Sequence, residues 1–229
     1  MKIRKYLFTG TALLAAFAVW TVLIQSVDVQ AVGVNGTEVG FAAINTWFHK
    51  LTGVHMAVYT VTDWLEIIPF CICGFFGIVG LLQLIKRKSL VRVDADIILL
   101  GIYYIVVIFA FFLFQMIPIN YRPILIDGAM EASYPSSTTL LVLSVMPSLK
   151  FQAARRSGNA AVRKAAVIFA EAFSAFMTVG RLISGVHWCT DIIGSVLLSA
   201  GLFKLYQFSV GFVEQRKSRP SPETPNGVH

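Results

Sequence analysis

Long apolar runs separated by shorter polar segments dominate the chain. A helix needs about 20 predominantly apolar residues to cross a bilayer, and six runs reach or approach that length. The expected spans are Tyr6–Ile24, Leu65–Ile85, Ala95–Phe114, Ser137–Leu149, Ala165–Ile183 and Ile192–Val210. The fourth is the shortest, and it lengthens to Ala154 if the polar residues after it join the helix. The pattern therefore predicts an all-α polytopic membrane protein, built as a six-transmembrane-helix bundle.

An amphipathic segment lies between the first two expected spans. From about residue 36 to 56, apolar side chains recur at Ile44, Trp47, Phe48 and Leu51, a spacing that suits one face of a helix. A helix of this kind lies in the plane of a membrane interface, with Trp at the level of the headgroups. We therefore expect an interfacial helix on the outer side of the membrane.

The chain fits one membrane-embedded domain, residues 1–215, followed by a polar tail. Residues 216–229 are rich in Pro and Ser, so we expect a disordered cytoplasmic tail there. The N-terminus also resembles a signal peptide, with a possible cleavage site at Val29-Gln30-Ala31. The apolar run from Leu7 to Ile24 is longer than a usual signal core, which favours an uncleaved anchor.

Composition and charge support the membrane assignment. The chain is 56% hydrophobic and 14% charged, whereas soluble domains are about a quarter charged. Its net charge of +7 would raise nucleic acid as a partner, but the basic residues gather at alternate ends of the spans. The four clusters are Lys2, Arg4 and Lys5; Lys86, Arg87, Lys88 and Arg92; Lys150, Arg155, Arg156, Arg163 and Lys164; and Arg216, Lys217 and Arg219. The positive-inside rule then places both termini in the cytoplasm, and no nucleic-acid partner is needed. We expect the membrane to be the plasma membrane.

The expected outer side carries ionisable residues that topology alone does not require. Arg122, Arg181, His187 and Asp191 all fall there, and ionisable groups at membrane depth are costly unless paired or solvated. His187 and Asp191 are four residues apart, so they share a face if the last helix begins near His187. The carboxylate would then bind one ring nitrogen and leave the other free as nucleophile or base. The alternative is an interfacial Arg and His that cap helix ends.

The residues before the fourth span point to an anion site. The segment from Gln115 to Pro135 is rich in polar and turn residues, and Ser136 opens the helix that follows. A Ser hydroxyl there caps free backbone N–H groups, and a helix N-terminus attracts anions. An ordinary Ser cap is the alternative. The cysteines, Cys71, Cys73 and Cys189, form neither a disulfide framework nor a zinc pattern, so we expect no metal and no cofactor.

Together these outer segments resemble the type-2 phosphatidic acid phosphatase and vanadium haloperoxidase superfamily. The motifs of that superfamily are KxxxxxxRP, PSGH and SRxxxxxHxxxD. The matching segments, in the same order and with the same internal spacing, are Gln115 through Arg122-Pro123; Pro135-Ser136-Ser137-Thr138; and Gly180-Arg181 followed by His187 and Asp191. The resemblance covers residues from about 114 to the end of the last span.

The resemblance implies an enzyme, a membrane phosphatase of lipid metabolism, whose substrate is a lipid phosphate drawn from the bilayer. It assigns His187 as the nucleophile that forms a phosphohistidine and Asp191 as its orienting partner. The residues that would hold the phosphoryl oxygens are Arg122, Ser136, Ser137, Thr138 and Arg181. Phosphatidic acid, phosphatidylglycerol phosphate and undecaprenyl diphosphate are substrates in the family, and the sequence selects neither among them nor among oligomeric states.

Three departures from the motifs bear on activity. Gln115 replaces a phosphate-binding Lys, Ser137-Thr138 replaces Gly-His, and Gly180 replaces a Ser. The missing His is the group that the family uses to protonate the leaving oxygen. Asp127 or Glu131 would be the substitute acid, unless each is simply a solvated loop carboxylate.

Without a substitute acid we expect lipid diphosphates to be preferred over monophosphates. The phosphate monoester that a diphosphate expels has a second pKa of about 6 and leaves unprotonated. The alternative function is a catalytically weak or inactive protein that binds or transports lipid phosphates. A vanadium haloperoxidase ranks third.

Three further carboxylates receive no catalytic assignment. Asp63 and Glu66 are expected to lie at the membrane interface and to bind water. Glu171, inside the fifth span, would pair with Arg181, pair with a neighbouring helix, or line a water-filled cavity.

Overall fold

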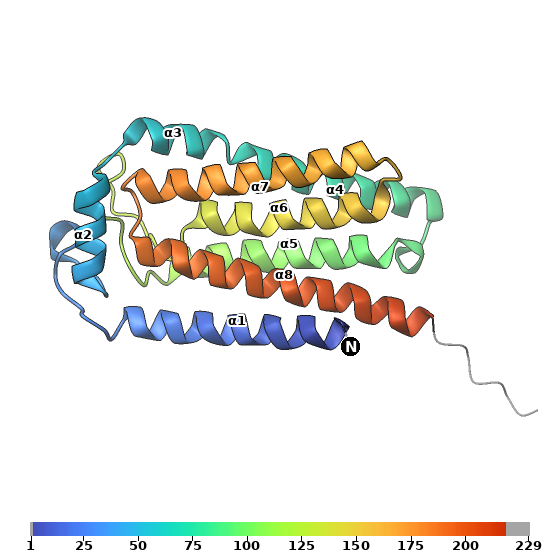
Figure 1. The fold of residues 1–229 in the computed structure, drawn as a ribbon, viewed down its shortest axis with the longest axis horizontal. Coiled ribbons are helices and arrows are strands. Elements are labelled where there is room, and N and C mark those ends of the chain that lie inside the picture. Colours follow the sequence, from blue (N-terminus) through green and yellow to red (C-terminus); the bar gives the residue numbers. More distant parts are fainter. Residues whose placement is uncertain (1, 219–229) are drawn as a thin grey trace, which may run out of the picture.

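The computed structural model describes residues 2–218, which form a bundle of long helices that run side by side (Figure 1). The β structure of these residues is limited to isolated bridges. The elements are α1 (Lys2–Ile24), η1 (Val34–Gly36), α2 (Ala42–Thr52), α3 (Met56–Trp64), α4 (Ile67–Arg87), η2 (Leu90–Arg92), α5 (Ala95–Met116), α6 (Ser137–Arg156), α7 (Ala160–Ile183) and α8 (Cys189–Lys217). The predicted all-α class is therefore correct.

Within residues 2–218, five helical segments are long and apolar enough to cross a membrane. They are Ile3–Ile24, Met56–Arg87, Ala95–Met116, Ala160–Ile183 and Cys189–Lys217. The expected fourth span, now α6, is not among them. The protein is thus an all-helical membrane protein with five recognisable spans, and the predicted count of six remains a proposal.

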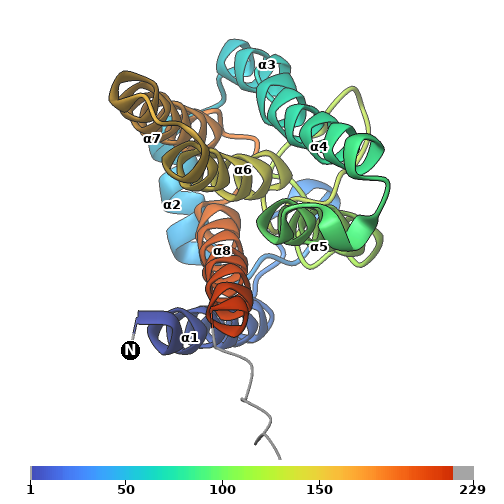
Figure 2. The same cartoon turned by 90° about the vertical axis from the view of Figure 1, so that its right-hand side faces the viewer.

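The position of α6 explains its low hydropathy. Figure 2 shows α6 in the interior of the bundle, with α4, α5, α7 and α8 around it. Its buried residues include Ser148, whose hydroxyl lies 2.7 Å from that of Tyr104, and Gln152, which donates to the hydroxyl of Tyr206 at 2.6 Å. A helix that faces other helices packs closely through small side chains and hydrogen-bonds its polar ones. It therefore lacks the apolar surface by which a span is recognised.

The second expected span, Leu65–Ile85, forms as α4 (Ile67–Arg87), and a break separates α4 from α3. A continuous helix through Pro69 would bring its ring against the carbonyl of Leu65, and Pro has no N–H to donate. The chain breaks at that point, and Pro69 lies in the first turn of α4, where proline is tolerated. The break puts Glu66 at a junction between α3 and α4 instead of inside one uninterrupted span.

Several predicted boundaries were too short. The last helix runs from Cys189 to Lys217, beyond the predicted Ile192–Val210, so residues 216 and 217 belong to α8 rather than to the tail. The rest of the predicted tail, residues 219–229, lies outside the described residues. The amphipathic segment forms a helix only over Ala42–Thr52, where Trp47 is exposed. Figure 1 shows this helix, α2, lying across one end of the bundle.

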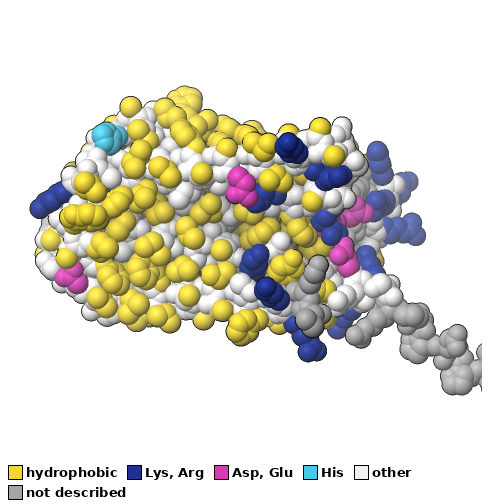
Figure 3. Space-filling view, in the orientation of Figure 1, with side chains coloured by type: hydrophobic (Ala, Val, Ile, Leu, Met, Phe, Trp, Pro, Cys, Tyr) yellow, Lys and Arg dark blue, Asp and Glu magenta, His cyan; other side chains and the backbone are white. Residues whose placement is uncertain are grey.

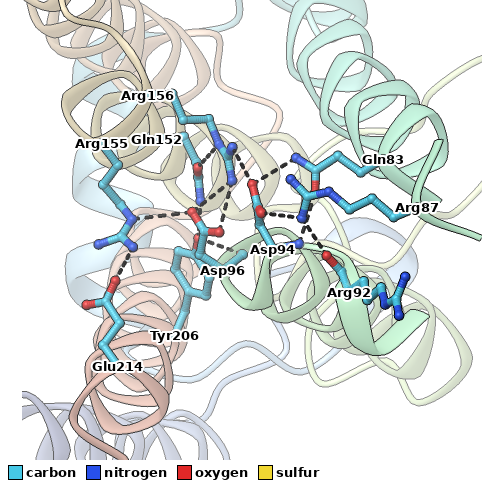
Figure 4. Close-up of polar contacts among 10 residues, drawn as sticks. All are labelled: Gln83, Arg87, Arg92, Asp94, Asp96, Gln152, Arg155, Arg156, Tyr206 and Glu214. Carbon is cyan, nitrogen blue, oxygen red and sulfur yellow. Dashed lines mark hydrogen bonds and ion pairs between the residues drawn. The ribbon is translucent and has the colours of Figure 1, made fainter. Parts of the chain in front are cut away.

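The two ends of the bundle differ in charge. Lys and Arg side chains gather toward the right-hand end in Figure 3, the end where Figure 1 places the N-terminus and the α6–α7 link. Ion pairs join α4, α5, α6 and α8 at this end (Figure 4). Asp94 accepts from Arg87 at 2.8 Å, and Asp96 accepts from Arg156 at 2.9 Å. Glu171 pairs with Lys150 on α6, a neighbouring helix, and not with Arg181.

Candidate active site

A tight turn between α7 and α8 positions the predicted nucleophile. Gly185 has a φ of +73°, and a Cβ there would meet the backbone of Gly53 in the α2–α3 link. The N–H of His55 donates to the carbonyl of Ser184 at 2.9 Å, which ties this turn to the same link. Since only glycine is comfortable in this conformation and at this distance, the turn is fixed immediately before His187.

The hydrogen bond to His187 leaves one ring nitrogen free. Its Nδ1 lies 3.1 Å from the carbonyl oxygen of Ser133, which can only accept, so Nδ1 carries the proton and Nε2 the lone pair. Nε2 is buried and has no partner among the described residues. Burial lowers the pKa of His187 to about 4, and the positive charges of Arg122 and Arg181 act in the same direction against the opposing effect of Asp191. At neutral pH the residue is therefore an uncharged imidazole whose Nε2 carries a lone pair.

Asp191 lies beside His187 but is not its hydrogen-bond partner. The Nδ1–Oδ2 distance is 3.7 Å, too long for a hydrogen bond. Asp191 Oδ2 instead accepts from the backbone N–H of Trp188 at 2.9 Å and caps α8, which begins at Cys189 rather than near His187. The two residues therefore do not share a helical face, because the carboxylate is used at the helix end. The Ser133 carbonyl holds the ring, and Asp191 fixes the backbone that carries it.

The two predicted arginines lie together and are only partly satisfied. The guanidinium carbons of Arg181 and Arg122 lie 4.9 and 5.7 Å from the centre of the same Tyr59 ring. Arg181 is 1% exposed; its Nη2 donates to Asp63 at 2.9 Å and to Thr138 at 2.5 Å, while Nε and Nη1 have no hydrogen-bond partner. Nε and Nη1 of Arg122 are equally unpartnered, although Nε lies 3.1 Å from a Glu131 oxygen in poor alignment.

Buried polar atoms without partners are rare, and those in a native structure call for a ligand or another explanation. The nitrogens of this kind in the cluster are Nε and Nη1 of Arg122, Nε and Nη1 of Arg181, and Nε2 of His187. Four of them are cationic donors, and the fifth is the lone-pair nitrogen of the predicted nucleophile. The four cationic donors suit an anion with several oxygens.

The start of α6 differs in detail from the prediction. Ser136 is the N-cap residue, but its hydroxyl makes no capping bond and instead lies 3.0 Å from the hydroxyl of Thr139. Ser137 is partly exposed. Thr138 is buried, accepts from Arg181 and donates to Glu66 Oε2 at 2.9 Å. Of the three, Thr138 is the residue whose side chain bonds directly to the arginine cluster.

Two carboxylates have a partner that was not predicted from the sequence. Asp63 and Glu66 were expected to bind water at the interface, whereas both approach Arg181, with N–O distances of 2.9 and 3.8 Å. Acidic residues within an apolar run close to a Pro were the available signal, because ionisable groups in a span mark a site by default. Of the expected substitute acids, Glu131 contacts the cluster through Arg122. Asp127 is exposed at a loop tip with a φ of +50°.

Two further observations complete the site. Gln115, at the motif's Lys position, is exposed in the last turn of α5. Within residues 2–218, no group of three or more His, Cys, Asp or Glu side chains is placed to hold a metal ion.

Comparison with known proteins gives a match in structure alone. No family model matches the sequence, and no curated protein matches it. The fold is similar to a crystal structure of a transmembrane PAP2-type phosphatidylglycerolphosphate phosphatase from Bacillus subtilis, with a TM-score of 0.57. The similarity covers 93% of this chain and 100% of that one at 18% sequence identity. The fold is therefore that of a PAP2-type membrane phosphatase.

Proposed function

We propose that the chain is an integral membrane phosphatase of the type-2 phosphatidic acid phosphatase superfamily, which hydrolyses lipid phosphates or diphosphates through a phosphohistidine on His187. The observation that carries the proposal is the group of buried, unpartnered nitrogens on Arg122, Arg181 and His187. A phosphoryl group supplies the oxygens that these donors lack and the electrophilic atom that Nε2 attacks. The similarity of fold supports the same conclusion.

Phosphoryl transfer requires mainly that the reacting groups are positioned and that the developing charge is stabilised. Phosphoryl transfer passes through a state whose charge is spread over the equatorial oxygens, so fixed cationic donors stabilise it. Arg122 and Arg181 are held in place by Tyr59, Asp63 and Thr138 before any substrate arrives. His187 is held by the Ser133 carbonyl with its lone pair available. In this scheme Asp191 acts by fixing the turn that carries the nucleophile.

The membrane placement is part of the proposal. The basic end of the bundle and both termini would lie on the cytoplasmic side, so the site would lie on the outer side of the plasma membrane. On this view α6 is a sixth, interior span and α2 lies in the outer interface, where a lipid headgroup enters the site. The single domain then comprises residues 1–215 with the tail on the cytoplasmic side.

A second candidate is a lipid-phosphate binding or transport protein that keeps the anion cradle without turnover. The absence of the motif Lys and His at Gln115 and Thr138 favours it. Phosphate release from purified protein in detergent separates the two, with phosphatidic acid, phosphatidylglycerol phosphate and undecaprenyl diphosphate as substrates. We expect release from at least one of these lipids. Saturable binding with no release from any of them would identify the binder instead.

A further inference from the structure

Glu66 reaches the site from the break between α3 and α4. Its Oε2 accepts a hydrogen bond from Thr138 Oγ1 at 2.9 Å and lies 3.8 Å from Arg181 Nη2. Its side chain is 20% exposed. Thr138 is the residue that stands where the superfamily motif has its proton-donating His. A carboxyl group is therefore fixed next to the position from which that His is missing.

The neighbouring carboxylates are less suited to proton transfer. Asp63 is engaged by Arg181 and is 51% exposed, and Glu131 is held against Arg122 and is 41% exposed. Asp127 lies at an exposed loop tip. Glu66 is the most buried of the four, and only one of its oxygens is bonded within the described residues. Its Oε1 is therefore available to a substrate oxygen or a water.

We propose that Glu66 is the proton-transfer residue of this site, a role that rests on the proposed phosphatase function. In the first step the Nε2 lone pair of His187 forms the P–N bond, and the P–O bond to the leaving group breaks with its electron pair. The Glu66 carboxyl gives its proton to that oxygen. In the second step water attacks phosphorus and gives a proton to the Glu66 carboxylate. The P–N bond then breaks, the electron pair returns to Nε2, and phosphate leaves.

Thr138 and Arg181 position the group. Thr138 accepts a hydrogen bond from the Arg181 guanidinium and donates one to Glu66 Oε2. These two hydrogen bonds orient the Glu66 side chain relative to Arg181, which is only 1% exposed. The proton gained from water in the second step is the one given to the next leaving group. This role revises the substrate expectation drawn from Thr138 alone. With Glu66 in place, lipid monophosphates are turned over as well as diphosphates.

The test compares Glu66→Gln with the wild type on a lipid monophosphate and a diphosphate that carry the same lipid. The amide keeps an oxygen for Thr138 and a similar size but transfers no proton. Loss of general acid catalysis lowers rates by ~10²–10⁴. We expect a loss of that size for the monophosphate and a much smaller one for the diphosphate. Adding Thr138→His to Glu66→Gln should restore monophosphate turnover selectively.

Asp63→Asn is the matched control, because it removes the other carboxylate on Arg181. It should slow both substrates by the same factor. Equal losses for both substrates in Glu66→Gln, or no loss, would overturn the role of Glu66 while leaving the phosphatase proposal intact. A wild type that releases no phosphate would overturn both. If Glu66→Gln does not fold, Glu66→Asp serves, because it keeps a carboxyl but withdraws it by one methylene: the monophosphate rate should fall more than the diphosphate rate, and an equal fall in both, or none, would overturn the role.

Discussion

The arginine cluster, Arg122 and Arg181, allows a quantitative prediction for a substitution at Arg181. Its guanidinium has two buried nitrogens without partners, Nε and Nη1, and a third, Nη2, bound by Asp63 and Thr138. In Arg181→Lys the charge and a partner for Asp63 remain, but a single nitrogen replaces the planar fork. At least one donor to the phosphoryl oxygens is then lost. Removal of one such donor lowers kcat by ~10²–10³, about 3–4 kcal/mol of transition-state stabilisation.

Phosphate release by the purified variant measures this loss. Arg156→Lys is the matched control, since it makes the same change in the ion-pair network at the opposite end of the bundle. That variant should keep the wild-type kcat. A kcat for Arg181→Lys close to that of the wild type would refute the argument, because the unpartnered nitrogens would then have no part in the reaction.

Two further predictions concern pH and topology. The pKa of His187 is about 4, so its protonation should not reduce kcat/KM until the pH approaches that value, and a pH–rate profile in detergent checks this. In the unfolded chain the pKa of His187 is near 6.5, so the unfolded state binds this proton more readily than the folded state. The contribution of His187 to the free energy of unfolding is therefore complete above pH 6.5 and decreases as the pH falls toward 4. In His187→Gln this pH dependence should be absent. A stability that is flat in the wild type across this range would contradict the burial of an unprotonated ring. For topology, in a variant without its native cysteines, Ala129→Cys should react with an impermeant thiol reagent in intact cells and Gly158→Cys should not. The reverse labelling would invert the proposed orientation.

Local patterns in the sequence predicted much of the fold. Apolar runs located five spans, because lipid-facing helices must be apolar around most of their surface. The same reasoning predicted too short a helix at α6. Its polar residues Ser148 and Gln152 form hydrogen bonds with tyrosines of other helices, and such tertiary contacts are not visible in the apolar pattern. Pro69 is the local signal for the break before α4, but it lies within an apolar run that was predicted as one continuous helix.

The site was predicted less completely. Motif spacing singled out Arg122, Arg181 and His187; the two arginines lie over the same Tyr59 ring, and the charges of both act on the pKa of His187. The nearest partner of His187 Nδ1 was not predicted: it is the backbone carbonyl of Ser133, at 3.1 Å, while the predicted partner Asp191 lies 3.7 Å from the same nitrogen. Glu66 could not be placed from spacing, because its approach to Thr138 depends on how two non-adjacent helices pack. Long-range contacts of this kind leave no periodic signal in the chain.

The most direct test of the central claim is to trap the phosphoenzyme. Purified protein is mixed with a lipid phosphate labelled in the phosphoryl group, quenched during turnover and mapped by peptide mass spectrometry. We predict an acid-labile, base-stable phosphate on His187. It should be absent in His187→Ala, which should also release no phosphate while remaining folded. Continued phosphate release by His187→Ala, with no labelled histidine in the wild type, would contradict this claim.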